Sequence, residues 1–169
     1  MMSAIHRPVW LAERPRRVIF PQGLLLPERV ALNVPLTSRQ DALLELARLA
    51  GQRKGPNVKV VVERLGRREA RESTAIGHGA ALPHADIPGL KVPLAVYLRP
   101  SRPIAFDAPD GKPVSDILAF LVPRPATAAH FEMLTGLAQV LGTQALRDEL
   151  AACRDAASVC ALFSQWPAA

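Results

Sequence analysis

Two segments in the first half of the chain repeat apolar residues at the spacing of an amphipathic helix. The first begins after Ser38 and ends at Gly51, and its apolar positions are Leu43, Leu46, Ala47 and Ala50. The second begins after Asn57, and its apolar positions are Val58, Val61, Val62 and Leu65. The run of valines at 60–62 is also typical of a strand, but the spacing favours a helix.

Two apolar segments in the second half of the chain, residues 92–98 and 114–122, are typical of buried strands. A stretch rich in turn-forming residues separates them. The remaining helices are predicted along a face formed by Phe131, Leu134, Ala138 and Leu141, after Thr143, and from Asp155 or Ser158 to near Phe163. Helices on both sides of the strand segments indicate a layered α/β domain.

The composition is that of one folded domain, because the 169 residues are 49% hydrophobic and 21% charged. The net charge of +6 comes from the first part of the chain. Residues 1–68 hold 13 basic and 5 acidic residues, whereas residues 69–169 hold 8 and 10. The basic residues are scattered and form no lysine-rich run interleaved with aromatic residues. A solvated basic surface is therefore favoured, and no nucleic-acid partner is expected.

Residues 1–22 are predicted to be a basic extension, because they carry four arginines and three prolines without a sustained period. The domain itself is expected over residues 23–169. The extension has no uninterrupted apolar stretch of the kind found in secretory signals. The longest apolar run, residues 117–122, is too short to cross a membrane. We therefore expect a cytoplasmic protein that does not insert into a membrane.

His84 is the histidine whose neighbours in the sequence indicate chemistry. It follows Pro83, which restricts the local backbone, and it comes after Gly77-His78-Gly79, a turn whose amides can approach an anion. A histidine beside such a loop is a candidate phosphoryl acceptor or general base. The alternative is a structural histidine at the end of a strand or loop.

Other familiar site patterns are missing from the sequence. There is no GxxxxGK[ST] and no complete GxGxxG, so nucleotide binding is not indicated. A metal site could be drawn from His84, Asp86 and His130, but no HExxH or CxxC accompanies this set. Neither a metal nor another cofactor is therefore expected. Ser73 lies in no G-x-S-x-G pattern, which argues against serine catalysis.

Four short motifs together point to one family. They are the pair Arg68-Glu69, the segment STAIGHGAALPH at 73–84, the segment PIAFDA at 103–108, and LVP at 121–123 shortly before His130. Their combination resembles the fructose and mannitol class of enzyme IIA domains of the bacterial phosphotransferase system, and most nearly the nitrogen-regulatory enzyme IIA. The resemblance implies a phosphotransferase component with a three-layer α/β sandwich, in which helices flank a central mixed sheet.

The resemblance also implies roles for particular residues. His84 would accept a phosphoryl group from a phosphohistidine on an HPr-type carrier, with His130 assisting and Arg68 neutralising charge. The protein would then regulate partner proteins, such as a kinase or a transporter, according to its phosphorylation state; a homodimer stays open. Hydroxyls and backbone amides in the loop before His84 are predicted to bind phosphate, and these residues are Ser73, Thr74, Gly77 and Gly79.

Two positions depart from the nitrogen-regulatory pattern, since Glu72 and Ala75 stand where that pattern usually has glycine. A carboxylate at 72 would disfavour a bound phosphate if it pointed inward, but we expect it to face solvent. His78 is expected to be an exposed loop residue, and Asp86 is a candidate to orient a ring nitrogen of His84. Two alternatives stay open: a sugar-type IIA component that donates to a separate IIB protein, and an interaction module that is not phosphorylated.

Overall fold

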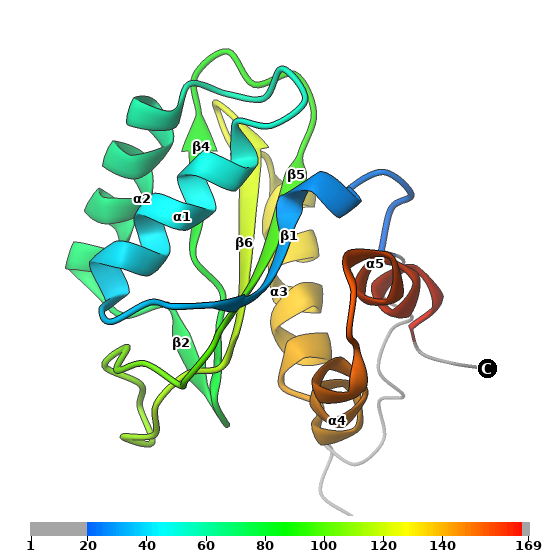
Figure 1. The fold of residues 1–169 in the computed structure, drawn as a ribbon. Helices are drawn as coiled ribbons and strands as arrows, with labels where there is room; N and C mark the ends of the chain where they lie inside the picture. Colours follow the sequence, from blue (N-terminus) through cyan, green and yellow to red (C-terminus); the bar gives the residue numbers. More distant parts are fainter. Residues whose placement is uncertain (1–19, 167–169) are drawn as a thin grey trace, which may run out of the picture.

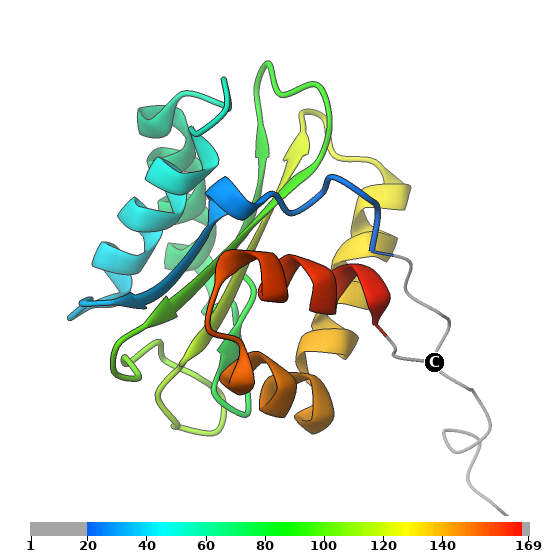
Figure 2. The same ribbon diagram turned by 45° about the vertical axis from the view of Figure 1, so that its right-hand side comes forward.

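The computed structural model describes residues 20–166, which form three layers (Figure 1). The strands of the six-stranded mixed sheet are β1 (Val30–Val34), β2 (Ala75–Gly77), β3 (Ala80–Ala81), β4 (His84–Ile87), β5 (Leu94–Pro100) and β6 (Asp116–Pro123). The helices are α1 (Arg39–Ala50), α2 (Val58–Arg71), α3 (Ala128–Leu141), α4 (Gln144–Ala152) and α5 (Ala156–Gln165), with a short 3₁₀ helix η2 (Pro27–Arg29). Helices α1 and α2 cover one face of the sheet, and α3, α4 and α5 cover the other (Figure 2). The predicted three-layer α/β sandwich is confirmed.

Strand β6 organises the sheet around the region of His84. It runs antiparallel to β5 on one side, and on the other side it pairs in parallel first with β3 and then with β4. Strand β1 lies beyond β5, and β2 lies beyond β3. In this register Ala80 lies opposite Asp116 and His84 lies opposite Phe120. Strand β4 therefore forms an outer edge of the sheet beside the second half of β6, and His84 is its first residue.

The helix boundaries follow the capping residues that the sequence predicts. The Ser38 hydroxyl accepts a hydrogen bond from the Asp41 amide at 3.1 Å, and the Asn57 side chain accepts one from the Val60 amide at 3.3 Å. Of the two predicted starts for α5, Asp155 is confirmed, because its carboxylate accepts from the Ser158 amide at 2.7 Å. The run of valines at 60–62 lies within α2, as the helical spacing predicted.

The two predicted strands are present as β5 and β6, and each begins two residues later than predicted. Four shorter strands were not predicted. Strands β2 and β3 consist of alanine, isoleucine and glycine over two or three residues, and β4 is only four residues long. Segments of this length carry too few positions for a hydrophobic period to be recognised.

The core has two halves because side chains of the central strands alternate between the two helix layers. Val96 and Ile117 pack toward α1 and α2, whereas Tyr97 and Phe120 pack toward α3, α4 and α5. Of the extension predicted at residues 1–22, only 20–22 fall within the described residues. Phe20 is buried there, with its ring 5.2 Å from that of Phe163. Within residues 20–166, none of the helices has the length and apolarity needed to span a bilayer.

Candidate functional site

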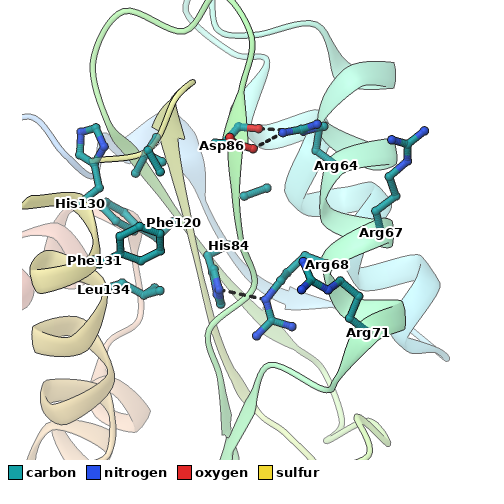
Figure 3. A pocket seen from close by; sticks show the side chains of 13 residues that line it. Arg64, Arg67, Arg68, Arg71, His84, Asp86, Phe120, His130, Phe131 and Leu134 are labelled. Atoms are coloured by element: carbon teal, nitrogen blue, oxygen red, sulfur yellow. Dashed lines mark hydrogen bonds and ion pairs between the residues drawn. The ribbon is translucent and has the colours of Figure 1, made fainter. Parts of the chain in front are cut away.

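A pocket of about 470 Å³ opens over the edge strand β4, between α2 on one face of the sheet and α3 on the other (Figure 3). One wall is basic and comes from α2, and the opposite wall is largely apolar and comes from β6, from α3 and from Ala126 in the loop before α3. The lining residues are Arg64, Arg67, Arg68, Arg71, His84, Ala85, Asp86, Phe120, Val122, Ala126, His130, Phe131 and Leu134. The three residues His84, Arg68 and His130, which the motifs single out, therefore meet in one pocket.

Hydrogen bonds at both ring nitrogens orient the half-buried imidazole of His84. Its Nδ1 lies 2.9 Å from the Leu82 carbonyl oxygen, and its Nε2 lies 3.1 Å from Nε of Arg68. A guanidinium only donates and a carbonyl only accepts, so Nδ1 carries the proton and Nε2 presents a lone pair. The backbone is held as well, since the Pro83 carbonyl accepts from the Phe120 amide at 2.9 Å. The ring is thus fixed in the tautomer that carries its proton on Nδ1 and its lone pair on Nε2.

The surroundings of His84 keep this ring uncharged. Burial is the largest effect and lowers the pKa of the His84 imidazole below its ordinary value of 6.5. The Leu82 carbonyl and Glu69 raise that pKa, while the positive charge of Arg68 lowers it. The lowering by burial and Arg68 exceeds the raising by the Leu82 carbonyl and Glu69, so the imidazole of His84 is mostly neutral near pH 7. A neutral imidazole is the form that can attack phosphorus.

Arg68 lies in the last turn of α2 and is held in place from two sides. Its Nε donates to His84, and its Nη1 donates to the Glu72 carbonyl oxygen at 2.8 Å. The Glu72 carbonyl lies just beyond the end of α2, where helix carbonyls lack intrahelical partners. The Arg68 guanidinium therefore caps the C-terminal end of α2 and also donates to the imidazole of His84.

Four arginines of α2 share the face that lines the pocket, because they are spaced at i, i+3, i+4 and i+7. We call Arg64, Arg67, Arg68 and Arg71 the arginine ridge. Arg64 bonds the carboxylate and the backbone carbonyl of Asp86, and Arg67 pairs with Glu63 at 2.7 Å. Within residues 20–166, Arg71 has no carboxylate in ion-pair range. Excess positive charge therefore lies beside His84.

His130 lies on the opposite wall, in the first turn of α3. It forms a reciprocal cap with Thr127: the Thr127 amide donates to Nδ1 of His130 at 3.0 Å, and the His130 amide donates to the Thr127 hydroxyl at 3.4 Å. Because Nδ1 accepts, the ring proton is on Nε2. No hydrogen bond joins His130 to His84 within the described part of the chain, so the two imidazoles line the same pocket from separate walls (Figure 3).

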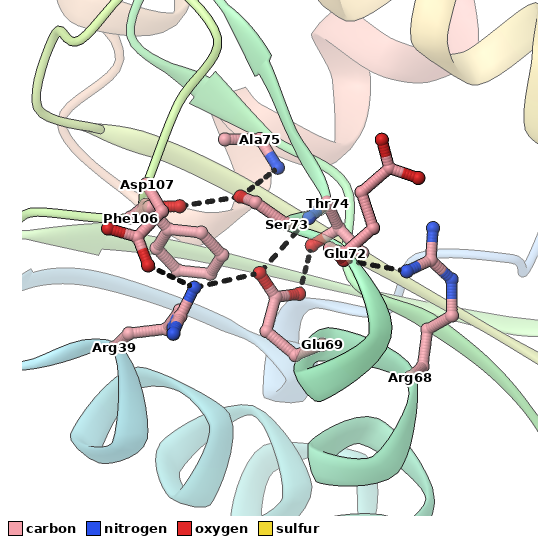
Figure 4. Close-up of polar contacts among 9 residues, drawn as sticks. All are labelled: Arg39, Arg68, Glu69, Glu72, Ser73, Thr74, Ala75, Phe106 and Asp107. Carbon is pink, nitrogen blue, oxygen red and sulfur yellow. Dashed lines mark hydrogen bonds and ion pairs between the residues drawn. The ribbon is translucent and has the colours of Figure 1, made fainter.

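A buried carboxylate behind the pocket fixes the segment that leads to His84 (Figure 4). Glu69 is 5% exposed and accepts from both the amide and the hydroxyl of Thr74, at 3.0 and 2.5 Å. Arg39 pairs with Glu69 at 3.6 Å and with Asp107 at 3.0 Å. The Ser73 hydroxyl donates to the Phe106 carbonyl at 2.6 Å. Three of the four motifs, those at 68–69, 73–84 and 103–108, thus meet in one polar cluster.

The four residues predicted to bind phosphate do not line the pocket. The hydroxyls of Ser73 and Thr74 are engaged in the cluster of Glu69, as described above. Gly77 and Gly79 have positive φ angles of 86° and 78°, which form the turn between β2 and β3. The amide between these glycines, that of His78, donates to Asp110 at 2.8 Å. The geometry gives all four residues a structural part outside the pocket lining, and their contact with phosphate stays a prediction.

A metal site does not form in the described part of the chain. No group of three histidine, cysteine or acidic side chains in residues 20–166 is arranged to hold a metal ion. The set drawn from the sequence fails because the Asp86 carboxylate is bound by Arg64, and His130 lies on the wall opposite His84. The pocket lining offers the imidazoles of His84 and His130 and the guanidinium groups of α2.

Comparison with known proteins agrees with this geometry. The family described as phosphoenolpyruvate-dependent sugar phosphotransferase system, EIIA 2, matches residues 24–166. The chain belongs to this family. Members of the EIIA type-2 family are components of phosphotransferase systems, and this chain shares that general role.

Among relatives of this EIIA type-2 chain, the nitrogen regulatory protein of Bradyrhizobium diazoefficiens is 35% identical over 145 residues, which cover 86% of this chain and 95% of that protein. The nitrogen regulatory protein of Pseudomonas aeruginosa is 35% identical over 130 residues, covering 76% and 84%. The crystal structure of nitrogen regulatory protein IIA-Ntr from Neisseria meningitidis matches with a TM-score of 0.77 at 34% identity, covering 83% of this chain and 96% of that one. The resemblance inferred from the motifs is confirmed.

The positions at which this EIIA type-2 chain departs from the expected motif stay away from the pocket. Glu72 is exposed and does not line it, as expected, and Ala75 is buried in β2. His78 is exposed, also as expected. The prediction that Asp86 orients a ring nitrogen of His84 is wrong, because Asp86 bonds Arg64 and the Leu82 carbonyl orients the ring.

The arginine ridge and the apolar wall of this EIIA type-2 pocket were not predicted from sequence patterns. The spacing of the four arginines was visible in the sequence, but their charges were counted with the scattered basic residues of the first part of the chain. Phe131 was assigned to a buried helix face, whereas the structure leaves it 59% exposed at the pocket. That exposure depends on where α3 lies against the sheet, which no local pattern encodes.

Proposed function

We propose that this EIIA type-2 domain is a phosphohistidine carrier of the nitrogen phosphotransferase branch. His84 accepts a phosphoryl group from a phosphohistidine on an HPr-type carrier, and the protein regulates partner proteins in the cytoplasm according to its phosphorylation state. One observation carries the proposal: His84 is a neutral imidazole whose Nδ1–H is held by Leu82 and whose Nε2 faces Arg68 in a pocket walled by arginines.

The transfer step exchanges one phosphorus–nitrogen bond for another. Nε2 of His84 attacks phosphorus while the bond to the donor imidazole breaks, and the bonding pair returns to the donor ring. The His84 ring keeps its Nδ1 proton and gains positive charge. The Leu82 carbonyl, 2.9 Å from Nδ1, accepts that proton's hydrogen bond and stabilises the charged ring. Onward transfer to an acceptor is the same step in reverse.

Arg68 has to change partner during this step. Its Nε–H occupies the lone pair of Nε2 before transfer, so it must leave Nε2 and donate to a phosphoryl oxygen. Phosphoryl transfer depends mostly on in-line positioning and on neutralising the charge of the equatorial oxygens. Arg71, one turn further along the same helix face, is available to neutralise further charge. His130 can add a hydrogen bond from its Nε2–H.

The interaction-module alternative loses the feature that suggested it. It rested on Glu72 and Ala75, and the carboxylate of Glu72 neither lines the pocket nor is buried. A pocket that repels phosphate electrostatically would need unpaired acidic side chains in its lining. The observed lining has four arginines and one acidic side chain, Asp86, which is paired with Arg64.

The test is reconstitution with enzyme I, the HPr-type carrier from the same genome and phosphoenolpyruvate. We expect phosphate on wild-type protein that is acid-labile and base-stable, with a phosphorus NMR signal of an Nε2-linked phosphohistidine. His84→Asn should take up none. His78→Asn, which alters an exposed histidine outside the pocket, should take up as much as wild type.

Three results would count against this proposal or refine it. No phosphate on wild-type protein, or phosphate that persists in His84→Asn, contradicts it. Fast onward transfer to a purified fructose-type IIB protein would favour the sugar-component alternative. Partner binding that is the same for wild type and His84→Asn, with no phosphorylation detected, would favour the interaction module.

A further inference from the structure

The arginine ridge forms one rim of the pocket and an exposed aromatic residue forms the other. The Arg67 side chain is 71% exposed, whereas that of Arg64 is 21% exposed and is paired with Asp86. Across the pocket, Phe131 is 59% exposed on the first turn of α3. His84 lies between the two rims on β4.

Any protein that delivers a phosphoryl group to His84 must cover both rims. The reacting atoms of a transfer step approach to roughly 3–3.5 Å, and Nε2 of His84 belongs to a half-buried ring at the edge strand. A donor histidine on a folded carrier therefore enters between α2 and α3. The surface around that histidine then rests on the arginine ridge and on Phe131.

The charge on the ridge is available to a partner. The pair of Arg67 with Glu63 lies at the surface, where both side chains are more than half exposed, and exposed pairs of this kind contribute little to stability. Arg71 has no acidic partner in ion-pair range within residues 20–166. Docked carboxylates would therefore find two guanidinium groups without displacing a buried salt bridge.

We propose that the phosphoryl donor of this protein docks through an acidic surface: carboxylates around its phosphohistidine contact Arg67 and Arg71, and an apolar side chain contacts Phe131. This proposal rests on the proposed function and specifies the chemistry of the donor. Complementary charge speeds encounter and suppresses wrong partners. The ridge would therefore select an acidic carrier over a basic one among carriers with the same reactive histidine.

The experiment measures the second-order rate of transfer from the phosphorylated HPr-type carrier of the same genome. Arg67→Glu is compared with Arg154→Glu, which makes the same change of charge at an exposed position between α4 and α5, in the other helix layer. We expect Arg67→Glu to lower kcat/KM about ten-fold or more, and Arg154→Glu to stay within about two-fold of wild type. Raising the salt concentration should slow transfer to wild type more steeply than transfer to Arg67→Glu.

A small phosphoryl donor separates docking from chemistry. Phosphoramidate reacts with the imidazole without a protein surface, so the ratio of the carrier rate to the phosphoramidate rate should fall in Arg67→Glu and stay unchanged in Arg154→Glu. If wild type takes phosphate from neither donor, the proposed function itself fails. If wild type is phosphorylated by the carrier but Arg67→Glu is equally fast with the same salt dependence, the docking proposal alone is overturned.

The same variants test whether duplex DNA, another polyanion, binds the arginine ridge. If duplex DNA binds wild-type protein and Arg67→Glu abolishes that binding while carrier transfer is unchanged, the ridge serves nucleic acid and the docking proposal is overturned. If duplex DNA at micromolar concentration does not slow transfer from the carrier, the docking proposal is supported.

Discussion

Nε of Arg68 lies 3.1 Å from Nε2 of His84, so this guanidinium occupies the lone pair that attacks phosphorus in the proposed transfer. The same pair influences the protonation of the ring. Burial first, and then the charge of Arg68, lowers the pKa of His84 against the opposing effect of the Leu82 carbonyl. Burial and Arg68 together therefore favour the neutral ring, and in the proposed transfer the same guanidinium is in position to bind the phosphoryl oxygens.

Replacing Arg68 should raise the pKa of His84. In Arg68→Gln the positive charge is gone while most of the burial stays, so the pKa of His84 should lie closer to 6.5 than in wild type. An NMR titration of the imidazole measures this shift. Arg154→Gln, a matched loss of charge in the other helix layer, should leave the titration unchanged, and an unchanged titration in Arg68→Gln would refute the electrostatic role.

The rate of phosphate uptake should depend on pH in the direction set by the lowered pKa of His84. The reactive species is the neutral ring, so uptake from phosphoramidate should decline as pH falls, with its midpoint below pH 6.5. In Arg68→Gln the decline should begin at higher pH. Dividing each rate by that of free imidazole, corrected for the neutral fraction of imidazole, removes the titration of the donor. A wild-type decline centred above pH 6.5 would contradict this expectation.

Stability should fall with acid over the window between the two pKa values of His84. The pKa is lower in the folded protein than in the unfolded chain, so below about pH 6.5 the unfolded chain binds a proton that the folded protein does not. The free energy of unfolding should therefore decrease by up to about 1.4 kcal/mol per pH unit until the folded ring also protonates. Urea titrations of wild type should show this slope in excess of His84→Asn, and parallel slopes would disprove it.

Removing the buried carboxylate behind the site should destabilise the fold. Glu69→Ala leaves the amide and hydroxyl of Thr74 without their acceptor and removes one of the two carboxylates that pair with Arg39. The expected loss in the free energy of unfolding is about 2–3 kcal/mol, measured by urea denaturation. Glu63→Ala removes an exposed carboxylate from the same helix and should change stability by less than about 0.5 kcal/mol. Equal losses in the two variants would contradict a structural role for Glu69.

The sequence was sufficient to predict that His84, Arg68 and His130 lie near one another, because their motifs resemble those of one family, and all three line the pocket. It was insufficient to predict where the hydroxyls of Ser73 and Thr74 point. Their hydroxyls look like phosphate ligands in a glycine-rich loop, but the loop turns them toward Glu69 and toward a carbonyl 33 residues away. A local pattern records which groups can bond an anion, and tertiary packing decides which of them point at it.

The same limit applies to the elements of the fold. Helices α1, α2 and α5 could be predicted because apolar spacing and capping residues agree within one segment. Strand β4 could not, although it carries His84, because its four residues are recognisable as a strand only once they pair with β6. Edge strands of this length depend on a partner that is distant in the sequence.

His130 offers a final test, since its two ring nitrogens have different tasks. Nδ1 caps α3 by accepting from the Thr127 amide, and in the proposed transfer Nε2–H donates to the phosphoryl group. His130→Gln keeps an acceptor for the cap, so its free energy of unfolding should stay within about 0.5 kcal/mol of wild type, whereas His130→Ala should lose about 1 kcal/mol. Transfer from the carrier should slow about 10- to 100-fold in both variants. A glutamine variant with the wild-type rate would confine His130 to capping the helix.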